Sequence, residues 1–410
     1  MSTHTAIAAD LPPRITLGSP AFLNVSGALF LAGFSTFSLL YCVQPLLPAF
    51  AKTFAVGPAA SSLALSLTTG FLAIAIFGMG ALSQRFARRD LMFGSMLAAA
   101  VLNLLAGVAP AWPLLLTFRA LEGLALGGVP AVAMAYLAEE IDAAHLGKAI
   151  GLYIGGTAFG GMMGRVGMGL LLAVVSWRSA MVVMGGLDII AAIGFFCLLP
   201  PSRYFAPGPG LSLADHLTLW GRHLRNGALL RLFAIGFILT SVFVGLFNYA
   251  TFRLALPPFR LNASLISLIF LTYVLGMFGS SAGGGLADRF GRRAPLLAGL
   301  LLMVSGVLMT LGDNLVLTIA GISLVTVGFF IAHAVASAWV GRLAGDAKSH
   351  AASLYLLFYY LGSSVTGVAA GWAWQAGGWG AVVATTAALG AIGVAIGQTI
   401  KEGDQGRRKP

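Results

Sequence analysis

Two copies of one charged turn, lying about half a chain length apart, constrain the fold more than any other feature of this sequence. The first copy, residues 80–89, reads GALSQRFARR, and the second, residues 284–293, reads GGLADRFGRR. Each copy lies between two long apolar runs. A turn that recurs at the same place in each half of a chain indicates a duplicated bundle of helices, and duplicated membrane bundles of this kind generally move a solute.

The apolar runs are too long and too numerous for a water-soluble domain. Hydrophobic residues make up 58% of the 410 residues and charged residues only 9%, whereas a soluble domain carries about 25% charged residues. Several runs reach the roughly 20 residues that an α-helix needs to cross a bilayer. An open sheet cannot satisfy its backbone in lipid, and the alternation of a barrel is absent, so we predict an all-α integral membrane protein.

Twelve runs are long enough to be transmembrane helices. They cover residues 22–47, 61–83, 91–109, 112–138, 148–172, 179–199, 228–252, 262–284, 294–311, 315–341, 351–374 and 379–400. Landmarks that recur in the second half at the same spacing are Leu152 and Leu354, Gly160 and Gly362, and Trp177 and Trp379. We therefore predict two pseudo-symmetric bundles of six helices each, arranged as parallel repeats.

The same pattern divides the chain into five parts. These are an N-terminal tail (1–21), a first bundle (22–199), a linker (200–227), a second bundle (228–400) and a C-terminal tail (401–410). The linker opens with prolines and glycines and continues into the amphipathic stretch 211–225. That stretch fits a short helix on the inner membrane face and a solvated tether equally well.

The basic residues indicate how the chain is oriented. Eighteen Lys and Arg residues fall in one set of connecting segments, which includes the linker and both chain ends, and only four fall in the opposite set. Because cytoplasmic loops are enriched in Lys and Arg, we expect both termini and the linker to be cytoplasmic, in the inner membrane of a prokaryote. The net charge of +11 is then a topology signal, and we expect no nucleic-acid partner.

The second turn follows the pattern Gly-x-Leu-Ala-Asp-Arg-x-Gly-Arg-Arg, the most specific signature of the major facilitator superfamily. With its twelve spans, long linker and repeat, the chain resembles that superfamily over nearly its whole length. The resemblance implies the major facilitator fold and a cytoplasmic gate at the turn; the alternative is that the turn only sets topology. The residues of this expected gate are Gly284, Asp288, Arg289, Gly291, Arg292 and Arg293, with Gly80, Arg85, Arg88 and Arg89 in the first copy.

The first copy departs from the signature at two positions. Gln84 stands where the pattern has Asp, and Ala87 stands where it has Gly. If the latch needs a carboxylate, the first half lacks one in its turn. Whether Glu139 or Glu140, at the inner end of the fourth span, compensates by pairing with a basic residue of the first turn is left open.

Two further stretches make the chain similar to the twelve-span drug:proton antiporters of this superfamily, in the YnfM-type branch. They are residues 40–48, LYCVQPLLP, and residues 133–140, AMAYLAEE. The resemblance implies proton-coupled efflux of a small amphiphilic compound or drug. The antiporter signature of the fifth span is matched at 156–161 except that Thr157 replaces a proline, so proton symport or facilitated transport of a sugar or organic acid stays as an alternative. A non-transporting sensor or scaffold is a third.

Charged residues inside the spans call for a specific role, since a charge at mid-bilayer costs at least ~3 kcal/mol. Arg119 and Glu122 are three residues apart and share a helix face. We expect Glu122 to carry a proton, and the resemblance to antiporters implies that Arg119 assists its transfer; the alternative is a fixed internal ion pair. Asp188, central in its span, either pairs with Arg165 or Arg119 across helices or binds a proton or cation.

Polar and aromatic residues within the spans are candidates for a central substrate cavity. Arg165 either binds an anionic substrate group or extends outward to the headgroups, and His333 makes either a helix–helix hydrogen bond or a proton switch. The other cavity candidates are Tyr41, Gln44, Asn103, Asn248, Tyr249, Tyr355 and Tyr359. The first span holds no acid, which favours neutral or weakly acidic substrates over cationic ones.

The partners expected from the sequence are a small-molecule substrate, protons and the lipid bilayer, with the chain acting as a monomer. We expect no cofactor and no metal, because no Cys cluster or His-Glu-x-x-His site is present. We also expect no enzymatic activity. The hydrolase-like pattern at residues 279–283, GSSAG, lies inside an apolar span, where small residues serve helix packing.

Overall fold

The computed structural model describes residues 14–82, 86–205 and 212–401, and the regular elements within these ranges are all helices. Nine helices in these ranges are long and apolar enough to cross a membrane. The remaining spans are a shorter apolar helix in the second bundle, a glycine-rich helix in the first, and the second part of one interrupted helix.

The first bundle contains six spans, four of which are single helices. These are α3 (Pro58–Leu82), α4 (Arg88–Val108), α7 (Leu146–Leu171) and α8 (Trp177–Leu198). The first span joins α1 (Pro20–Tyr41), η2 (Gln44–Leu46) and α2 (Leu47–Thr53), and the fourth joins α5 (Trp112–Leu126) and α6 (Gly128–Glu140). Pro45 explains the interruption of the first span, because proline has no N–H to continue the helical hydrogen bonds.

The second bundle repeats this plan. Its single-helix spans are α10 (Gly227–Ala255), α13 (Arg293–Met309) and α14 (Leu315–Leu343), and its second span joins α11 (Ala263–Ser267), η3 (Leu268–Thr272) and α12 (Tyr273–Phe290). Helix α15 (Lys348–Thr399) supplies two spans, because Gly377 and Gly378 interrupt it with non-helical backbone angles. Gly378 has φ 61°, a left-handed conformation that glycine adopts at little cost. The predicted architecture of twelve spans in two bundles is confirmed.

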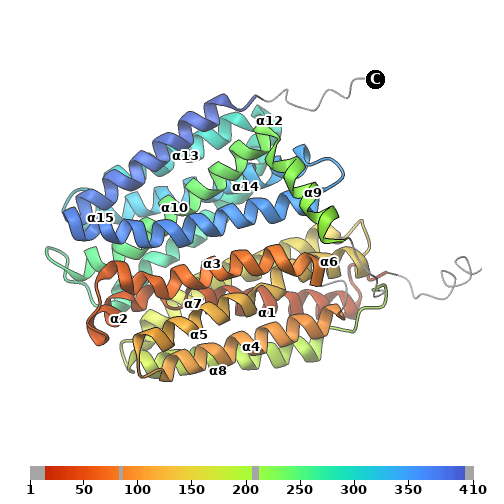
Figure 1. Ribbon diagram of the computed structural model, residues 1–410, viewed down its shortest axis with the longest axis horizontal. Coiled ribbons are helices and arrows are strands. Elements are labelled where there is room, and N and C mark those ends of the chain that lie inside the picture. The colour runs from red at the N-terminus through yellow and green to blue at the C-terminus, as the bar shows by residue number, and fades with distance from the viewer. Residues whose placement is uncertain (1–13, 83–85, 206–211, 402–410) are drawn as a thin grey trace, which may run out of the picture.

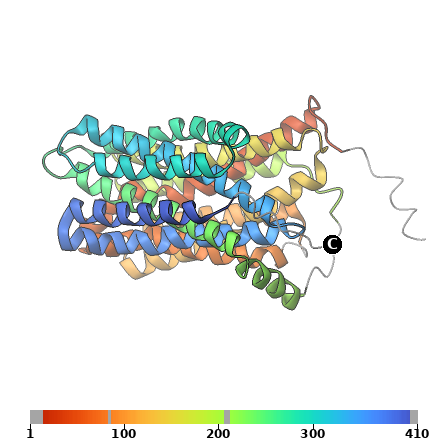
Figure 2. The same ribbon diagram turned by 90° about the horizontal axis from the view of Figure 1, so that it is seen from above.

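The two bundles lie side by side with their helices roughly parallel (Figure 1). Between them in sequence is α9 (Leu213–Leu224), which lies at one end of the molecule, and Figure 2 shows this green helix at the same end from above. We call the end that carries α9, Arg88 and Arg293 the basic end. The end that carries α2 and α11 is the opposite end.

The bundles are joined more closely at the opposite end than at the basic end. There Ser264 of α11 donates to the carbonyl of Gly169 in α7 at 3.2 Å. Helices α3 and α15 also pack together, and Ser364 donates to the carbonyl of Ser66 at 2.7 Å. Helices α6 and α14, both fully described and both ending at the basic end, form no packed interface with each other.

Small residues of α7 let it pack directly on α1. A Cβ on Gly160 would meet the backbone of Phe34, and a Cβ on Gly164 would lie 2.6 Å from the Cα of Ser38. Only glycine permits so close an approach of two helix backbones. The contact brings Ser38 and the residue after Gly164, which is Arg165, to the centre of the molecule.

The linker contains a helix that packs on both bundles. Ser212 accepts from the backbone N–H of Asp215, whose carboxylate accepts in return from the backbone of Ser212, so α9 begins with a capping box. The ring of Trp220 stacks on Phe77 of α3 with 3.7 Å between centroids, and its Nε1 donates to Ser353 of α15 at 3.2 Å. Of the two alternatives for this stretch, the helix is the one observed.

Candidate functional site

The interruption of the first span leaves backbone carbonyls free inside the first bundle. Helix α1 ends at Tyr41, and the last carbonyls of a helix have no N–H of the same helix to accept from. Leu39 and Leu40 carry two of these carbonyls. They form a ready site for a buried cation.

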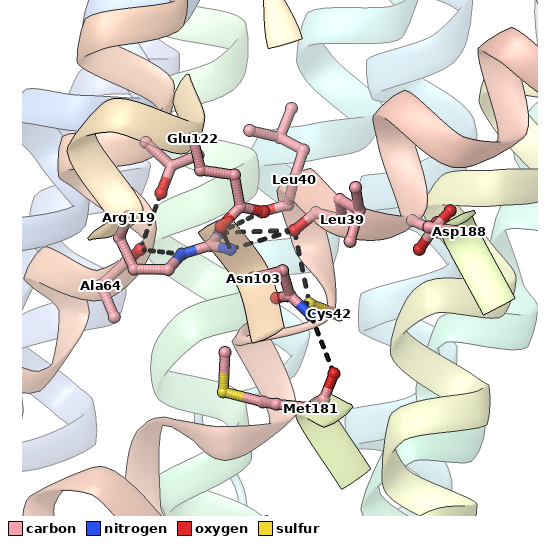
Figure 3. A network of polar contacts seen from close by, with 11 residues as sticks. Leu39, Leu40, Cys42, Ala64, Asn103, Arg119, Glu122, Met181 and Asp188 are labelled. Atoms are coloured by element: carbon pink, nitrogen blue, oxygen red, sulfur yellow. Dashed lines mark hydrogen bonds and ion pairs between the residues drawn. The ribbon is translucent and has the colours of Figure 1, made fainter. Parts of the chain in front are cut away.

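Arg119 of α5 occupies that position. Its Nη1 lies 2.6 Å from Oε2 of Glu122, one helical turn further along. Its Nε donates to the carbonyl of Ala64 at 3.0 Å, and its Nη atoms donate to Leu39 at 3.3 and 3.4 Å and to Leu40 at 3.1 Å (Figure 3). Both charged side chains are completely buried. Paired, hydrogen-bonded charges of this kind are the form in which ions are tolerated inside a membrane.

The ion pair leaves part of Glu122 unused. Its second oxygen, Oε1, is buried and has no hydrogen-bond partner among the residues that the structure describes. A carboxylate accepts at both oxygens, so a proton can be taken up at Oε1 without breaking the contact of Oε2 with Arg119.

Asp188 of α8 is a buried acid with a different environment. The hydroxyl of Ser38 donates to its two oxygens at 3.0 and 3.1 Å, and the side chain is completely buried. Within the described ranges it forms no ion pair with Arg119 or Arg165, so the cross-helix pairing considered for it is not observed. In Figure 3 no dashed line joins Asp188 to the Arg119 network.

Asn103 of α4 makes polar contacts with two other helices. Its Nδ2 donates to the carbonyl of Met181 at 2.9 Å, and its Oδ1 lies 3.7 Å from the sulfur of Cys42 (Figure 3). The side chain thus ties α4 to α8 and to the break in the first span.

Arg165 of α7 lies where the two bundles meet. Its Nε donates to Oε1 of Gln44 and its Nη1 to the carbonyl of Gly161, each at 2.5 Å. Gln44 in turn donates from Nε2 to Oδ1 of Asn248 in α10 at 2.7 Å. A chain of side-chain hydrogen bonds therefore crosses from α7 through the first span to the second bundle, and it joins three residues that the sequence placed in the cavity.

Aromatic rings from both bundles surround the same guanidinium. Its central carbon lies 3.8 Å from the ring centre of Tyr41, 4.8 Å from that of Tyr273 and 5.2 Å from that of Phe270. Tyr41 belongs to the first bundle, and the other two belong to the second. Arg165 does not extend outward to the headgroups, because its side chain is only 1% exposed.

A second aromatic cluster lies within the second bundle. His333 of α14 forms a 2.9 Å hydrogen bond through Nδ1 with the hydroxyl of Tyr355, and its ring lies 4.8 Å from that of Tyr359. Phe329 stacks on the other side, with ring planes 2° apart. The hydrogen bond between α14 and α15 is the helix–helix contact that was one of the two alternatives for His333.

Tyr249 lies apart from this cluster. Its hydroxyl donates to the carbonyl of Gly367 at 2.8 Å, and its ring stacks with Phe252 and Trp374 towards the opposite end. The side chain is fully buried. It packs α10 against α15.

The second copy of the charged turn joins α12 to α13. Helix α12, which contains Gly284, ends at Phe290 and is followed by Gly291 with φ 78°, where a residue with a side chain would be strained. Arg293 begins α13 and donates to the carbonyl of Gln398 at 2.5 Å. Arg292 lies at the cap between the two helices.

The acidic residue of this turn is free in the present arrangement. Asp288 is exposed, and in the part of the chain that the structure describes it makes no hydrogen bond or ion pair. The guanidinium of Arg289 lies over the ring of Phe290 at 5.1 Å.

The first copy of the turn is held by a different acid. Gly80 lies in the last turns of α3, and Arg85 lies outside the described residues. Arg88 at the start of α4 pairs with Glu139 of α6 at 2.8 Å, and Arg89 donates to a carbonyl of α8 at 2.7 Å. Among the described residues, Glu139 thus pairs with a basic residue of this turn, whereas Glu140 pairs with Arg203 of the linker.

Sequence reasoning missed several residues of the site. Ser38, Ser66, Phe270 and Tyr273 all contact the residues discussed above. A signal for Ser38 was present, because it precedes Tyr41 by three residues and so shares its helix face. The two aromatic residues carried no such signal, since aromatic side chains in apolar spans usually serve packing.

Comparisons with known proteins agree with this architecture. The family model described as Major Facilitator Superfamily matches residues 29–282. The chain is 44% identical over 375 residues to the "Uncharacterized MFS-type transporter YybF" of Bacillus subtilis (strain 168), covering 90% of this chain and 91% of that protein. It is 41% identical over 383 residues to the "Inner membrane transport protein YnfM" of Escherichia coli (strain K12), covering 93% and 92%.

A solved structure shares the fold at low sequence identity. It is a bacterial homolog of the human lysosomal transporter Spinster, in an inward-facing and unoccupied conformation. The TM-score is 0.75 and the identity 16%, with 93% of this chain and 97% of that chain covered. The likeness concerns the arrangement of helices.

Proposed function

This chain belongs to the major facilitator superfamily of membrane transporters, and we propose that it exports a small amphiphilic compound in exchange for protons. The family establishes a multi-pass membrane protein that transports a small molecule. The excess of Lys and Arg supports a cytoplasmic basic end. Both termini and α9 then lie on the cytoplasmic side of the inner membrane. A single chain supplies both bundles, so the proposed functional unit is the monomer.

The observation that supports proton coupling is that two buried acids, Glu122 and Asp188, have different surroundings. Glu122 has Arg119 as its counter-charge, whereas Asp188 accepts from the hydroxyl of Ser38 and has no cationic partner among the described residues. A carboxylate without a cation is costly inside a membrane, so Asp188 is the acid whose charge most needs a proton. Arg119 stabilises Glu122 in its ionised form, and Oε1 of Glu122 provides a second place for the proton.

Both acids are connected to the mobile interface through the first span. Ser38 contacts Asp188, and the carbonyls of Leu39 and Leu40 bind Arg119. Gln44, four residues after Leu40, bonds to Asn248 in the second bundle. A change of protonation that moves the end of α1 is therefore transmitted to the contact between the bundles.

The arrangement of the bundles supports alternating access. The opposite end is closed by α7 and α11, and the basic end has no α6–α14 interface. With the basic end cytoplasmic, this is the inward-facing state of the cycle. Outward opening would separate Ser264 from Gly169, and closure of the basic end would bring the free Asp288 to its partner in the proposed gate.

Proton exchange can be tested in inside-out vesicles with an acidic interior and a pH dye. A panel of amphiphilic drugs, sugars and organic acids would be added to wild type, Asp188→Asn, Glu122→Gln and the control Asp313→Asn, whose acid is exposed at the opposite end. We expect substrate-dependent proton efflux from the vesicles in wild type and control, and loss of it in Asp188→Asn. Wild-type transport without any proton movement would contradict the proposed coupling.

One observation favours a second candidate, the symport or facilitated transport of an organic acid. Arg165 is a buried cation at the contact between the bundles, and it has only neutral partners in the described part of the chain. The same vesicles separate the two candidates, because a symporter moves protons in the direction of the solute and an antiporter moves them against it.

A further inference from the structure

We propose that Arg165 binds the carboxylate of the substrate, and that the substrate is a small organic monocarboxylate with a planar, apolar body. This inference rests on the proposed transport of a small molecule. It does not depend on the direction of transport or on the coupling to protons.

The first step is the charge balance around two buried arginines. Arg119 and Arg165 are the largest fully buried side chains of the described residues. Arg119 has the carboxylate of Glu122 at 2.6 Å. For Arg165, no carboxylate oxygen of the described residues lies within 4.0 Å. Buried charges are normally paired, so Arg165 lacks the anion that its environment calls for.

The protein partners of Arg165 do not supply that anion. The amide oxygen of Gln44 and the carbonyl of Gly161 are neutral acceptors, and they use two of the five guanidinium N–H groups. A guanidinium fork matches a carboxylate with two parallel hydrogen bonds. One guanidinium offers one such position, which favours a ligand with a single carboxylate.

The second step concerns two polar groups near the hydrogen bonds that join Arg165, Gln44 and Asn248. Neither group has a hydrogen-bond partner in the described ranges. They are Nδ2 of Asn248 and the hydroxyl of Ser66, and both are buried. A Cβ on Gly367 would lie 2.5 Å from the Ser66 oxygen and 3.4 Å from Asn248 Nδ2, so both polar groups pack against the same glycine of α15. Unsatisfied buried donors of this kind suit a ligand that brings acceptor oxygens.

The shape of the surroundings determines the rest of the ligand. The rings of Tyr41, Tyr273 and Phe270 face the guanidinium. The ring of Phe243 lies 5.5 Å from that of Tyr273, and Phe329 follows 4.1 Å further on. This aromatic wall extends from Arg165 to the His333 cluster. A planar apolar body can stack along it.

The position between the bundles explains how such a ligand acts on transport. Arg165 comes from the first bundle, whereas Tyr273 and Asn248 come from the second. A carboxylate at Arg165 competes with Gln44 for Nε, and Gln44 is the residue that reaches Asn248. The displaced bond lies within the first bundle, but it also holds the side chain of Gln44 that donates to Asn248 of the second bundle. Binding therefore alters the support of a contact between the bundles, which gives the ligand different affinities for different states of the cycle.

The test compares acids with their amides. Purified protein in lipid nanodiscs would be titrated calorimetrically with benzoate, cinnamate and hexanoate, and with benzamide, cinnamamide and hexanamide. We expect the aromatic acids to bind wild type at least tenfold more tightly than their amides, with hexanoate weaker than cinnamate. Arg165→Gln should lose that preference, and Arg165→Lys should keep part of it because the charge remains without the fork.

A matched control is available in Arg178, which also packs over an aromatic ring and donates to a backbone carbonyl, but at the opposite end. Arg178→Gln should bind the acids as wild type does. Equal binding of acids and amides by wild type would overturn the proposal, and so would undiminished acid binding by Arg165→Gln. The wild-type comparison decides the matter even if that variant does not fold.

The same titrations distinguish this inference from the function on which it rests. If the acids bind through Arg165 and no proton moves with them in vesicles, the carboxylate site stands and proton coupling fails. If protons exchange for a neutral or cationic compound and none of the acids binds, the coupling stands and the carboxylate site is wrong.

Discussion

Ser38 of α1 donates its hydroxyl hydrogen to both carboxylate oxygens of Asp188 in α8, at 3.0 and 3.1 Å. This contact joins two helices, and the two residues are 150 positions apart in the sequence. Ser38 is in turn held by Gly164 of α7, which packs on its backbone. The environment of the acid is therefore determined by a glycine on a third helix.

The first prediction concerns that glycine. Gly164→Ala places a Cβ 2.6 Å from the Cα of Ser38, so α1 and α7 must separate. We expect a loss of about 1–3 kcal/mol of stability, as for other overpacked cores, together with reduced transport. Gly167→Ala is the control, because no atom lies within 4 Å of its Cβ position. Thermal unfolding in detergent measures the stability of both variants. An equal loss of stability in the two would contradict the packing argument.

The second prediction concerns the Arg119–Glu122 pair. Glu122→Gln leaves the Arg119 charge uncompensated in the bundle, and Arg119→Met does the same to Glu122, so each should cost about 3–5 kcal/mol. The double variant should cost clearly less than the sum, because neither charge remains. A double-mutant cycle on unfolding in mixed micelles measures the coupling. Strict additivity would show that the pair contributes no mutual stabilisation.

The parts of this molecule that follow from local sequence could be predicted. The duplicated turn, the length of the apolar runs and the three-residue spacing of Arg119 and Glu122 each depend on neighbours in the chain. For this reason the twelve-span fold and the internal ion pair both appear in the structure. The pairing of Glu139 with Arg88 was one of a few alternatives, because both residues lie at the basic end.

The contacts between distant helices could not be predicted in the same way. Asp188 bonds to Ser38 rather than to an arginine, since the rotation of α8 against α1 determines which side chain it meets. Asn103 and Tyr249 donate to backbone carbonyls of neighbouring helices, and their polarity alone does not identify these partners. Tyr273 reaches Arg165 only through the packing of one bundle on the other.

The third prediction concerns the docking of α9. Nδ1 of His216 lies 2.9 Å from Nε2 of His350, and Nε2 of His223 lies 3.1 Å from the carbonyl of Ala347. His216 and His350 cannot form their contact when both rings are protonated, because both nitrogens would be donors and the rings would carry like charge. Burial lowers the pKa of His223; the bond to Ala347 opposes this shift in part, and the positive charge of Arg222 adds to it by a smaller amount.

The sign of the pH effect follows from this lowered pKa. Docked α9 binds fewer protons than released α9, so docking is strongest above the ordinary histidine pKa of about 6.5 and weakens as the pH falls below it. Spin labels at the exposed positions Leu217 and Ser349 should show one short distance at pH 8 and a longer, broader distribution at pH 5. The variant His216→Asn/His223→Asn should show much less change. A distribution independent of pH in the wild type would contradict the prediction.

The fourth prediction concerns the free acid of the second turn. Asp288 is exposed and makes no bond in the described part of this conformation, so Asp288→Asn should change stability by no more than about 0.5 kcal/mol. If Asp288 makes its contact only when the basic end closes, the same variant should slow transport several-fold, because it removes an interaction from one state of the cycle alone. Asp346→Asn, an exposed acid at the same end but outside the turn, is the control and should transport normally. The initial rate of substrate exchange in proteoliposomes, measured beside the unfolding temperature, separates the two effects. An unchanged rate in Asp288→Asn would mean that the turn sets topology and does not latch the gate.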